Sequence, residues 1–250
     1  MPDKPIVLFF IKAPFKGQVK SRLAVAVGEE AALELYKNFT LDIIDALSAS
    51  GYPFRIYFHP PYAEDAITTW LIGHTAAPQE GNDLGERMEL AFKNIFSEGF
   101  ASAILIGSDI PDLTPAVLHE ALESLKKNDA VIGPAADGGY YLIGFNQKSF
   151  LPRIFRGIPW STDTVLRETM DIMHESSLRV HLLPQLMDVD TLEDLKAFFE
   201  RNRDAGFNKS ETMTYLINNK LLAKMVRITQ SMITIDKNDW ISRIVRFFSS

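Results

Sequence analysis

Short runs of apolar residues, each stopped by glycine, proline or a charged residue, predict buried β-strands along the chain. These runs cover residues 6–11, 54–58, 103–107 and 130–134, and a further apolar stretch reaches Phe145 after the turn Asp137-Gly138-Gly139. Each run is too short for a helix, and uninterrupted apolarity is typical of parallel strands that are covered on both faces. Asp-Gly is a strong hairpin signal, so we expect a tight turn before the last stretch.

Apolar residues at helical spacing lie between these runs. Leu33, Tyr36, Phe39 and Ile43 belong to such a pattern over residues 28–50, which Gly51 ends. Further helices are expected over residues 63–71, from Asn82 or Asp83 to Phe96, over residues 115–127, from Ser161 or Thr162 to about His174, and after Thr191. This alternation of strands and helices predicts an α/β domain.

The composition fits an ordinary globular protein and excludes cysteine chemistry. Of 250 residues, 46% are hydrophobic, 23% are charged and none is cysteine, which excludes disulfides, cysteine-based zinc sites and a thiol nucleophile. Residues 1–200 carry 17 basic and 28 acidic residues, a net charge of −11, whereas residues 201–250 carry nine basic and four acidic residues, a net charge of +5. The acidic body formed by residues 1–200 argues against nucleic-acid binding. The apolar run near the start is too short for a signal peptide or a membrane span, and we expect a cytoplasmic protein.

Asp109 follows the predicted strand at residues 103–107 and is the centre of the functional interpretation. Ligands of open α/β sheets bind beyond the carboxyl ends of the strands, and a carboxylate there suits Mg²⁺ or Mn²⁺ that bridges to a phosphate. Serine and aspartate are also common turn residues, so Asp109 could equally cap the turn before the next helix. The local sequence leaves both interpretations open.

The loop after the first strand carries four cations, Lys12, Lys16, Lys20 and Arg22, within eleven residues. Gly17 would let backbone N–H groups approach an anion, and the cations would neutralise a polyphosphate. The segment has neither the Walker A nor the G-x-G-x-x-G pattern. In an acidic protein, we favour phosphate binding over a solvated basic loop.

Two glycine-containing loops are candidates for contact with a nucleotide or with a second substrate. In the first, Gly85 helps to make a loop that is pliable enough to meet a base or ribose beside Asp83, although helix capping alone explains most of this segment. In the second, Gly138 and Gly139 follow Asp137 and would let a second substrate approach the main chain, although a hairpin turn is the plainer explanation.

Asp188 and Asp190 alternate around Val189, so on an extended backbone both side chains point to the same side. Two neighbouring carboxylates without a basic partner repel each other, and a divalent cation would relieve that repulsion. Thr191 is expected to cap the next helix, with Asp194 at the N3 position of a capping box. The five histidines are scattered without metal-ligand spacing, so we treat them as structural or surface residues.

Six short segments stand in a fixed order along the chain: Lys12–Leu23, Gly81–Met88, Gly107–Pro111, Gly133–Tyr140, Trp160–Thr162 and Asp188–Thr191. Together they resemble the nucleotide-diphospho-sugar transferase superfamily with the GT-A fold. The resemblance spans about residues 6–202 and is nearest to a bacterial glycosyltransferase-like branch and to the 2-phospho-L-lactate guanylyltransferases. The family's first loop usually has Lys-Thr-Arg-Leu where this chain has Lys20-Ser-Arg-Leu23, a change that keeps the hydroxyl group.

The resemblance implies a three-layer α/β/α sandwich with a mixed, mostly parallel sheet over residues 1–202. Residues 203–250 lie outside the resemblance, and we expect a helical extension there from the spacing of their apolar residues. It also implies a nucleotide in the N-terminal half of the domain. A divalent cation, Mg²⁺ or Mn²⁺, would be held by Asp109 and Asp190, with Asp188 as the second choice. Family members differ in their reactions, so the resemblance fixes the class of substrate better than the product.

We therefore expect a metal-dependent transferase that uses a nucleotide-activated donor, most simply a nucleotide-diphospho-sugar glycosyltransferase. Lys12, Lys20 and Arg22 would stabilise charge on the phosphates, and Asp137 would orient or deprotonate the hydroxyl group of an unidentified acceptor. A nucleotidyltransferase that releases pyrophosphate is the first alternative, because Asp188-Val-Asp-Thr191 resembles that pattern. A nucleotide-binding module without turnover is the second.

The basic tail has apolar positions at helical spacing over residues 210–228 and 236–248. A basic, apolar end could lie on a membrane surface, but we favour packing against the acidic body of the chain or against the mate in a homodimer. The expected partners are thus a nucleotide or nucleotide-sugar donor and an acceptor, without nucleic acid or membrane.

Overall fold

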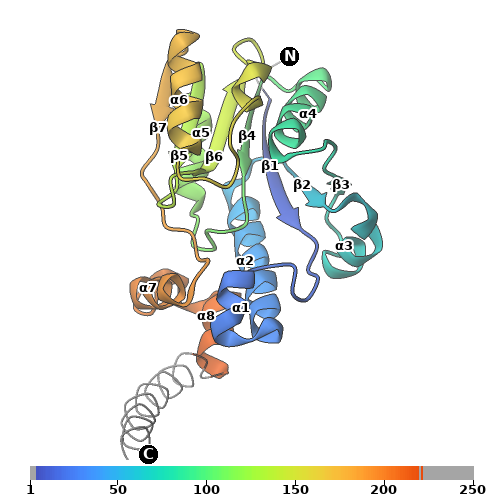
Figure 1. Ribbon diagram of the computed structural model, residues 1–250, viewed down its shortest axis with the longest axis vertical. Coiled ribbons are helices and arrows are strands. Elements are labelled where there is room, and N and C mark those ends of the chain that lie inside the picture. The colour runs from blue at the N-terminus through green and yellow to red at the C-terminus, as the bar shows by residue number, and fades with distance from the viewer. Residues whose placement is uncertain (1–3, 220, 222–250) are drawn as a thin grey trace, which may run out of the picture.

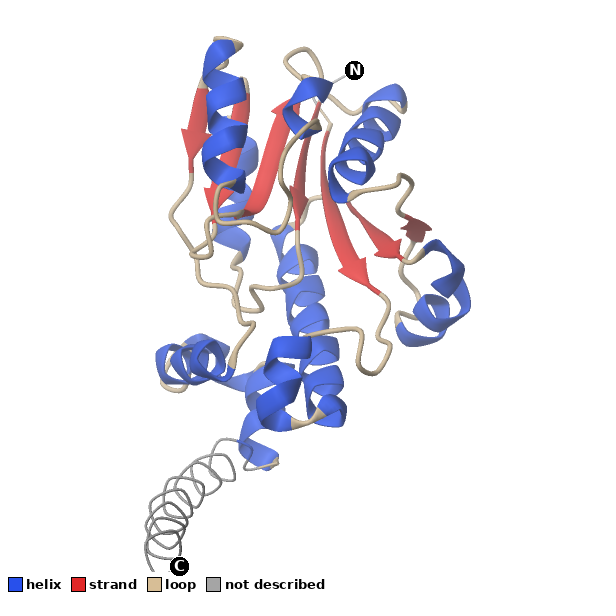
Figure 2. Cartoon of the chain, viewed as in Figure 1, coloured by secondary structure: helices blue, strands red, loops and turns tan. Residues whose placement is uncertain are grey.

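The computed structural model describes residues 4–219 and Leu221, and every structural statement below concerns this part of the chain. A seven-stranded sheet lies at its centre, with helices on both faces (Figure 1, Figure 2). The strands are β1 (Pro5–Lys12), β2 (Phe54–His59), β3 (Ala76–Pro78), β4 (Ser102–Ile106), β5 (Ala130–Pro134), β6 (Tyr140–Asn146) and β7 (Val180–Leu182). The helices are α1 (Ser21–Val27), α2 (Glu29–Ser50), α3 (Glu64–Trp70), α4 (Leu84–Ser97), α5 (Pro115–Ser124), α6 (Val165–Glu175), α7 (Leu192–Asn202) and α8 (Glu211–Asn218).

The strand order is β3-β2-β1-β4-β6-β5-β7. β1 is parallel to both of its neighbours, β2 and β4, with Phe9 opposite Ile56 on one side and Ile106 on the other. β6 runs antiparallel to β4 and β5, whereas β3 and β7 add parallel strands at the two edges. The expected mixed, mostly parallel sheet is therefore confirmed, as is the hairpin between β5 and β6.

Helices on both faces of the sheet explain why the whole of β1 is apolar. Its odd-numbered residues from Val7 to Ile11 pack in one cluster with residues of α2, α3 and α5. Its even-numbered residues from Ile6 to Phe10 pack in a second cluster with residues of α4 and α6. The three-layer α/β/α architecture is thus confirmed, and the central strands are completely covered.

A third apolar cluster joins the start of the chain to its C-terminal part. Leu23 of α1 and Phe39 of α2 pack there with Val189 and with residues of α7, α8 and Leu221. The carboxylate of Asp42 in α2 accepts hydrogen bonds from the backbone N–H groups of Glu211 (2.8 Å) and Thr212 (3.0 Å) at the start of α8. Residues on both sides of the expected boundary at residue 202 therefore share one core.

Several expected elements differ in extent. α1 begins inside the segment that we expected to be a loop, and the three-residue edge strands β3 and β7 were not expected. Neither Ser161 nor Thr162 caps α6, which begins at Val165; Ser161 has φ 68°, and the Thr162 hydroxyl donates to the carbonyl of Pro159. α5 ends at Ser124 rather than at residue 127.

The predicted caps Asp83 of α4 and Thr191 of α7 are confirmed, the latter in a capping box with Asp194. Of the helical pattern expected over residues 210–228, α8 accounts for the described part; the pattern over residues 236–248 lies outside the described residues. None of the helices in the described ranges combines the length and the apolar character that crossing a membrane requires.

Candidate active site

A cleft of about 690 Å³ lies where the carboxyl ends of β1, β2 and β4 meet the loops that follow them. Lys12 comes from the end of β1, Lys20 from the loop that follows it and Arg22 from α1. The loop after β4 contributes Gly107, Ser108 and Asp109. The other polar lining residues come from α1, α2, the end of β2, the segment after β3, α4, the β5–β6 hairpin and the segments before α6 and α7: Ser21, Tyr36, His59, Gln79, Arg87, Asp137, Tyr140, Tyr141, Ser161, Thr162, Asp163 and Asp190. Cations and carboxylates thus line the same cleft.

Two carboxylates of the cleft contact the ammonium of the same residue, Lys20. Its Nζ atom lies 2.5 Å from Asp109 Oδ1 and 2.9 Å from Asp190 Oδ1, and its side chain is only 3% exposed. Burial alone would lower the pKa of Lys20, but the charges of the two carboxylates outweigh it and hold the pKa above its ordinary value. The same ion pair lowers the pKa of Asp190, against the effect of its own burial. Lys20 therefore stays protonated where it lies between the two carboxylates.

The backbone around Lys20 and Asp190 holds these groups in place. Lys20 has a left-handed conformation (φ 48°, ψ 43°) immediately before α1, which is uncommon for a residue with a side chain. The N–H of Val189 donates to the carbonyl of Asp109 (2.9 Å), which ties the segment before α7 to the loop after β4. The ring of Phe39 lies beneath the Lys20 ammonium, 5.5 Å from ring centroid to Nζ.

The remaining cations differ in their exposure and contacts. Arg22, whose side chain is 67% exposed, donates to Asp190 Oδ2 from the cleft rim. Arg87 is half-buried and donates from Nε to the carbonyl of Asp83 (3.1 Å); burial lowers the pKa of its guanidinium. Burial, followed by the charges of Arg87 and Lys12, lowers the pKa of His59. This side of the cleft is accordingly positive, which favours an anionic ligand.

Tyr36 fixes the main chain of Lys12 at the end of β1. Its hydroxyl accepts a hydrogen bond from the Lys12 N–H (2.7 Å) and donates one to the Lys12 carbonyl (3.0 Å). Tyr36 is buried, and burial raises the pKa of its phenol to about 12. The hydroxyl group therefore remains neutral and serves to hold the strand end.

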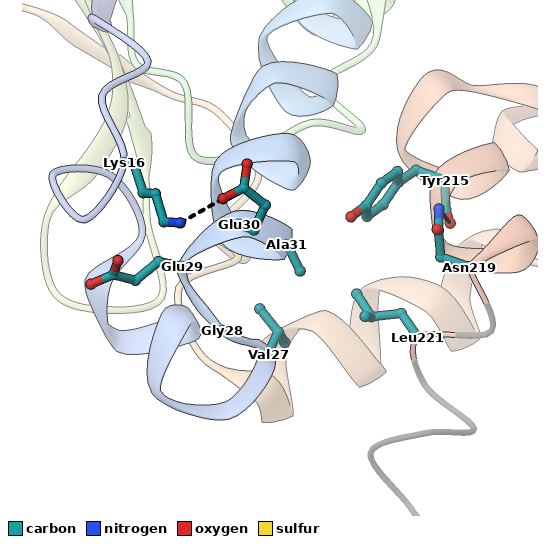
Figure 3. A pocket seen from close by; sticks show the side chains of 9 residues that line it. All are labelled: Lys16, Val27, Gly28, Glu29, Glu30, Ala31, Tyr215, Asn219 and Leu221. Carbon is teal, nitrogen blue, oxygen red and sulfur yellow. Dashed lines mark hydrogen bonds and ion pairs between the residues drawn. The ribbon is translucent and has the colours of Figure 1, made fainter.

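Lys16 lies outside this cleft, although it belongs to the same basic loop. Its Nζ atom pairs with Glu30 at 2.7 Å, and both residues line a second pocket of about 550 Å³ between the α1–α2 junction and α8 (Figure 3). The pocket is closed on the other side by Tyr215, Asn219 and Leu221. The cationic loop therefore divides, with Lys12, Lys20 and Arg22 at the cleft and Lys16 facing away from it.

The cleft brings together most of the residues expected from the sequence. Lys12, Lys20, Arg22, Asp109, Asp137, Gly139 and Asp190 line it, whereas Gly17, Asp83, Gly85, Gly138 and Asp188 are not among its lining residues in the described chain. The Asp83 side chain accepts from the N–H of Glu86 (2.8 Å), as a helix cap does. Direct contact of these five residues with a nucleotide or a metal remains a prediction.

The two glycines in this group have close neighbours that explain them. A Cβ on Gly85 would lie 2.2 Å from the carbonyl oxygen of Phe155, and a Cβ on Gly138 would lie 2.3 Å from that of Asp163. Gly138 also has φ +89°, which side chains rarely allow. Both glycines therefore let two backbone segments pack closely beside the cleft.

Two aspartates have environments that were not expected. Asp137 Oδ1 accepts a hydrogen bond from the N–H of Gly139 (2.9 Å), which closes the hairpin turn while the side chain stays exposed at the cleft. Burial, and then the charges of Asp137 and Asp190, raise the pKa of Asp188 to about 6. Asp188 is thus the carboxylate of this region that gains a proton most easily.

Sequence reasoning missed Tyr36, His59, Gln79 and Ser108 at the cleft. Gln79 donates from Nε2 to the carbonyls of Ile11 (3.2 Å) and Tyr57 (3.0 Å), and so joins the ends of β1 and β2. The sequence indicates Gln79 only weakly, because it is a single polar residue after a strand of three residues. Ser108 stood beside Asp109 in the sequence and could have been named with it.

The cleft offers carboxylate oxygens that could bind a divalent cation. Asp109 and Asp190 direct carboxylate oxygens toward one point, and such hard oxygen ligands suit Mg²⁺ or Mn²⁺. Within residues 4–219, no group of three or more His, Cys, Asp or Glu side chains is arranged to hold a metal. Mg²⁺ is commonly bound by one or two carboxylates together with substrate phosphates and water. The pair therefore fits a cation that arrives with a phosphorylated ligand.

Residues 41–162 match the family described as "Uncharacterized protein conserved in bacteria (DUF2064)". A crystal structure of a candidate nucleotide-diphospho-sugar transferase from Desulfovibrio desulfuricans G20 is similar over 88% of this chain and 97% of that chain, with 39% sequence identity and a TM-score of 0.85.

More distant structures are similar in fold alone. Rv0371c from Mycobacterium tuberculosis H37Rv is matched over 80% of this chain and all of its own, with 16% identity and a TM-score of 0.51. The 4-diphosphocytidyl-2C-methyl-D-erythritol synthase from Anaerococcus prevotii DSM 20548 is matched over 80% of this chain and all of its own, with 14% identity and a TM-score of 0.50.

Proposed function

This chain belongs to the nucleotide-diphospho-sugar transferase family, and from this premise we propose that it transfers a group from a nucleotide-activated donor to an acceptor hydroxyl group. The donor is a nucleotide-diphospho-sugar. The observation that carries the proposal is the convergence of Asp109 and Asp190, from two distant loops, on the buried ammonium of Lys20 inside a cleft at the carboxyl edge of the sheet.

The positive side of the cleft would bind the donor's diphosphate. Lys12 and Arg22 are exposed residues of its lining, and Arg87 is a half-buried one. Charge-assisted hydrogen bonds from such groups to phosphate oxygens are stronger than neutral ones. As the bond between the sugar and the diphosphate breaks, its electron pair passes to the diphosphate, and these cations stabilise the charge that develops there.

Asp109 and Asp190 would hold Mg²⁺ or Mn²⁺ on the donor's diphosphate. When bound, the cation supplies Lewis-acid stabilisation of the leaving diphosphate. Asp137 also lines the cleft, on the hairpin between β5 and β6, and is exposed there. It would accept the proton of the attacking hydroxyl group, whose oxygen forms the new bond to the sugar.

Nucleotidyl transfer is a second candidate, which the segment Asp188–Thr191 favours. In that reaction the acceptor attacks the α-phosphate of a nucleoside triphosphate, and pyrophosphate leaves. The same cations and the same carboxylate pair would serve, so the two reactions differ in the products rather than in the charges that the cleft supplies.

One assay tests both candidates. The full chain is incubated with a panel of UDP- and GDP-sugars, and separately with GTP and CTP, in the presence of Mn²⁺ or Mg²⁺. Release of nucleoside diphosphate from a sugar donor supports glycosyl transfer, whereas pyrophosphate without consumption of sugar donor supports nucleotidyl transfer. Nucleotide binding without either product would support a binding module.

Asp109→Asn and Lys16→Met form the matched pair of variants for this assay. Removing the Asp109 charge should lower the rate by about 10²–10³, while Lys16, which pairs with Glu30 outside the cleft, should be replaceable without effect. Metal-dependent binding of the donor that is equal in wild type and in Asp109→Ala would remove Asp109 from the site.

A further inference from the structure

The ammonium of Lys20 occupies the point at which the proposed cation would have to bind. Both carboxylates direct an Oδ1 atom at Nζ, at 2.5 and 2.9 Å, and the side chain is 3% exposed. Among the ion pairs of the described residues, Asp109 has Lys20 as its one basic partner. Asp190 differs, because its Oδ2 atom also pairs with Arg22.

An ammonium and a divalent cation cannot share this point. Each needs the same carboxylate oxygens, and two positive charges a few ångströms apart in a partly buried site repel each other strongly. If Lys20 leaves, Asp190 keeps a basic partner in Arg22, whereas Asp109 is left without its partner. A divalent cation in the place of the ammonium would restore the charge balance at Asp109, whose side chain is 53% exposed and therefore open to an incoming ion.

We propose that Lys20 and the divalent cation exclude one another at Asp109 and Asp190, so that the cation binds only when the Lys20 ammonium moves away, and that phosphate oxygens of the donor favour this movement by accepting the ammonium. This inference rests on the proposed function for the identity of the donor. The exchange itself concerns only the lysine, the two carboxylates and the metal. Lys20 acts as a positioning residue that couples binding of the metal to binding of the donor.

The structure gives Lys20 the means to make this movement. Its flexible four-carbon stem allows the ammonium to swing without a change in the main chain. Lys12 and Arg22 line the same cleft, so phosphate oxygens that they bind would offer the Lys20 ammonium an alternative partner there. The left-handed backbone of Lys20 and the start of α1 can therefore remain as they are.

The first test measures Mn²⁺ binding to the full chain without any nucleotide, from the electron paramagnetic resonance signal of free Mn²⁺. Lys20→Met should bind Mn²⁺ at least about tenfold more tightly than wild type, because a competing charge is gone. Lys20→Arg keeps the charge and should bind as weakly as wild type, and Lys16→Met, which removes a charge outside the cleft, should also match wild type. Adding Asp109→Asn to Lys20→Met should abolish the gain. Equal Mn²⁺ affinity of wild type and folded Lys20→Met would overturn the proposal.

The second test uses the native chain and does not depend on how the variants fold. Lysines are methylated reductively, and the extent of labelling at Lys20 is compared by mass spectrometry with that at Lys16, which is 55% exposed. Saturating Mn²⁺ alone should raise the labelling of Lys20 severalfold relative to Lys16, because the displaced ammonium becomes accessible. Unchanged labelling at saturating Mn²⁺ would contradict the exchange. A positive result in both tests without turnover of any sugar donor would leave the exchange standing and refute the proposed reaction.

Discussion

Replacing Gly85 by alanine tests whether this residue is needed for packing or for contact with a nucleotide. Gly85 is buried in the first turn of α4, where a Cβ would lie 2.2 Å from the Phe155 carbonyl oxygen and 2.8 Å from Trp160 Nε1. Carbon atoms in ordinary contact are about 3.5–4.0 Å from their neighbours. The backbones of α4 and Phe155 would therefore have to separate by more than about 1 Å.

The expected loss of stability follows from these distances. Overpacking in a core costs about 1–3 kcal/mol, and a clash with backbone places this substitution near the upper value. Alanine regains up to about 1 kcal/mol in helix propensity, which leaves a net loss of about 2 kcal/mol. With a urea m-value of about 3 kcal/mol/M, the midpoint of unfolding should fall by about 0.7 M.

Urea unfolding followed by circular dichroism measures this loss, with Gly206→Ala as the control. A Cβ on Gly206 would meet no atom within 4 Å, so its stability should stay within about 0.5 kcal/mol of wild type. Because Trp160 also lines the cleft, Gly85→Ala should weaken donor binding together with stability. Wild-type stability combined with lost donor binding would refute the packing explanation and assign the space beside Gly85 to the nucleotide.

Three further predictions concern charge, pH and the C-terminal part of the chain. Arg87→Met should weaken donor binding about tenfold in calorimetric titrations, because the cleft loses a charge-assisted hydrogen bond, whereas Lys93→Met, on the same helix and paired with Glu89, should bind as wild type does. The pKa of Asp188 is raised to about 6 in the folded chain, above an ordinary value of about 3.9. Protonated Asp188 therefore stabilises the folded chain to its full extent below about pH 4, and this stabilisation is lost as the pH rises through about 6. Asp188→Asn should consequently gain stability over wild type between about pH 4 and pH 7 in paired urea titrations; a pH-independent difference would contradict this. Leu216→Ala should cost about 2–5 kcal/mol of unfolding free energy, because it opens a cavity in the cluster shared by α1, α2, α7 and α8.

The main strands of the sheet could be predicted because their residues form short, uninterrupted apolar runs, which are typical of strands covered on both faces. Residues 6–11 and 103–107 are apolar without interruption, and the structure covers both of their faces with helices. β3 and β7, three residues each, offer too few positions for any periodicity. α1 was missed because its seven residues follow a basic loop and Lys20, at its N-cap position, makes no side-chain cap.

Some residues that line the cleft could be predicted from the sequence, among them Lys20, Asp109 and Asp190, but their arrangement could not. Asp109 and Lys20 are separated by 89 positions, and Asp190 and Lys20 by 170, so no local pattern relates them. The order of six family segments indicated that these residues share a site. It could not indicate that Lys20 would lie between the two carboxylates, because that depends on the left-handed backbone at Lys20 and on the bond that joins Val189 to Asp109.

The boundary expected at residue 202 shows how the C-terminal part bears on the site. Leu216 and Leu221 pack in the same cluster as Leu23, Phe39 and Val189. Each of these last three lies next to a charged group of the cleft: Leu23 follows Arg22, Phe39 supports the Lys20 ammonium, and Val189 precedes Asp190. Packing against α8 thus helps to hold the residues that contact or adjoin Lys20 and Asp190. The segment after residue 202 that the structure describes is therefore part of the scaffold that positions the charges, and the stability of α8 and the geometry of the ion pair should change together.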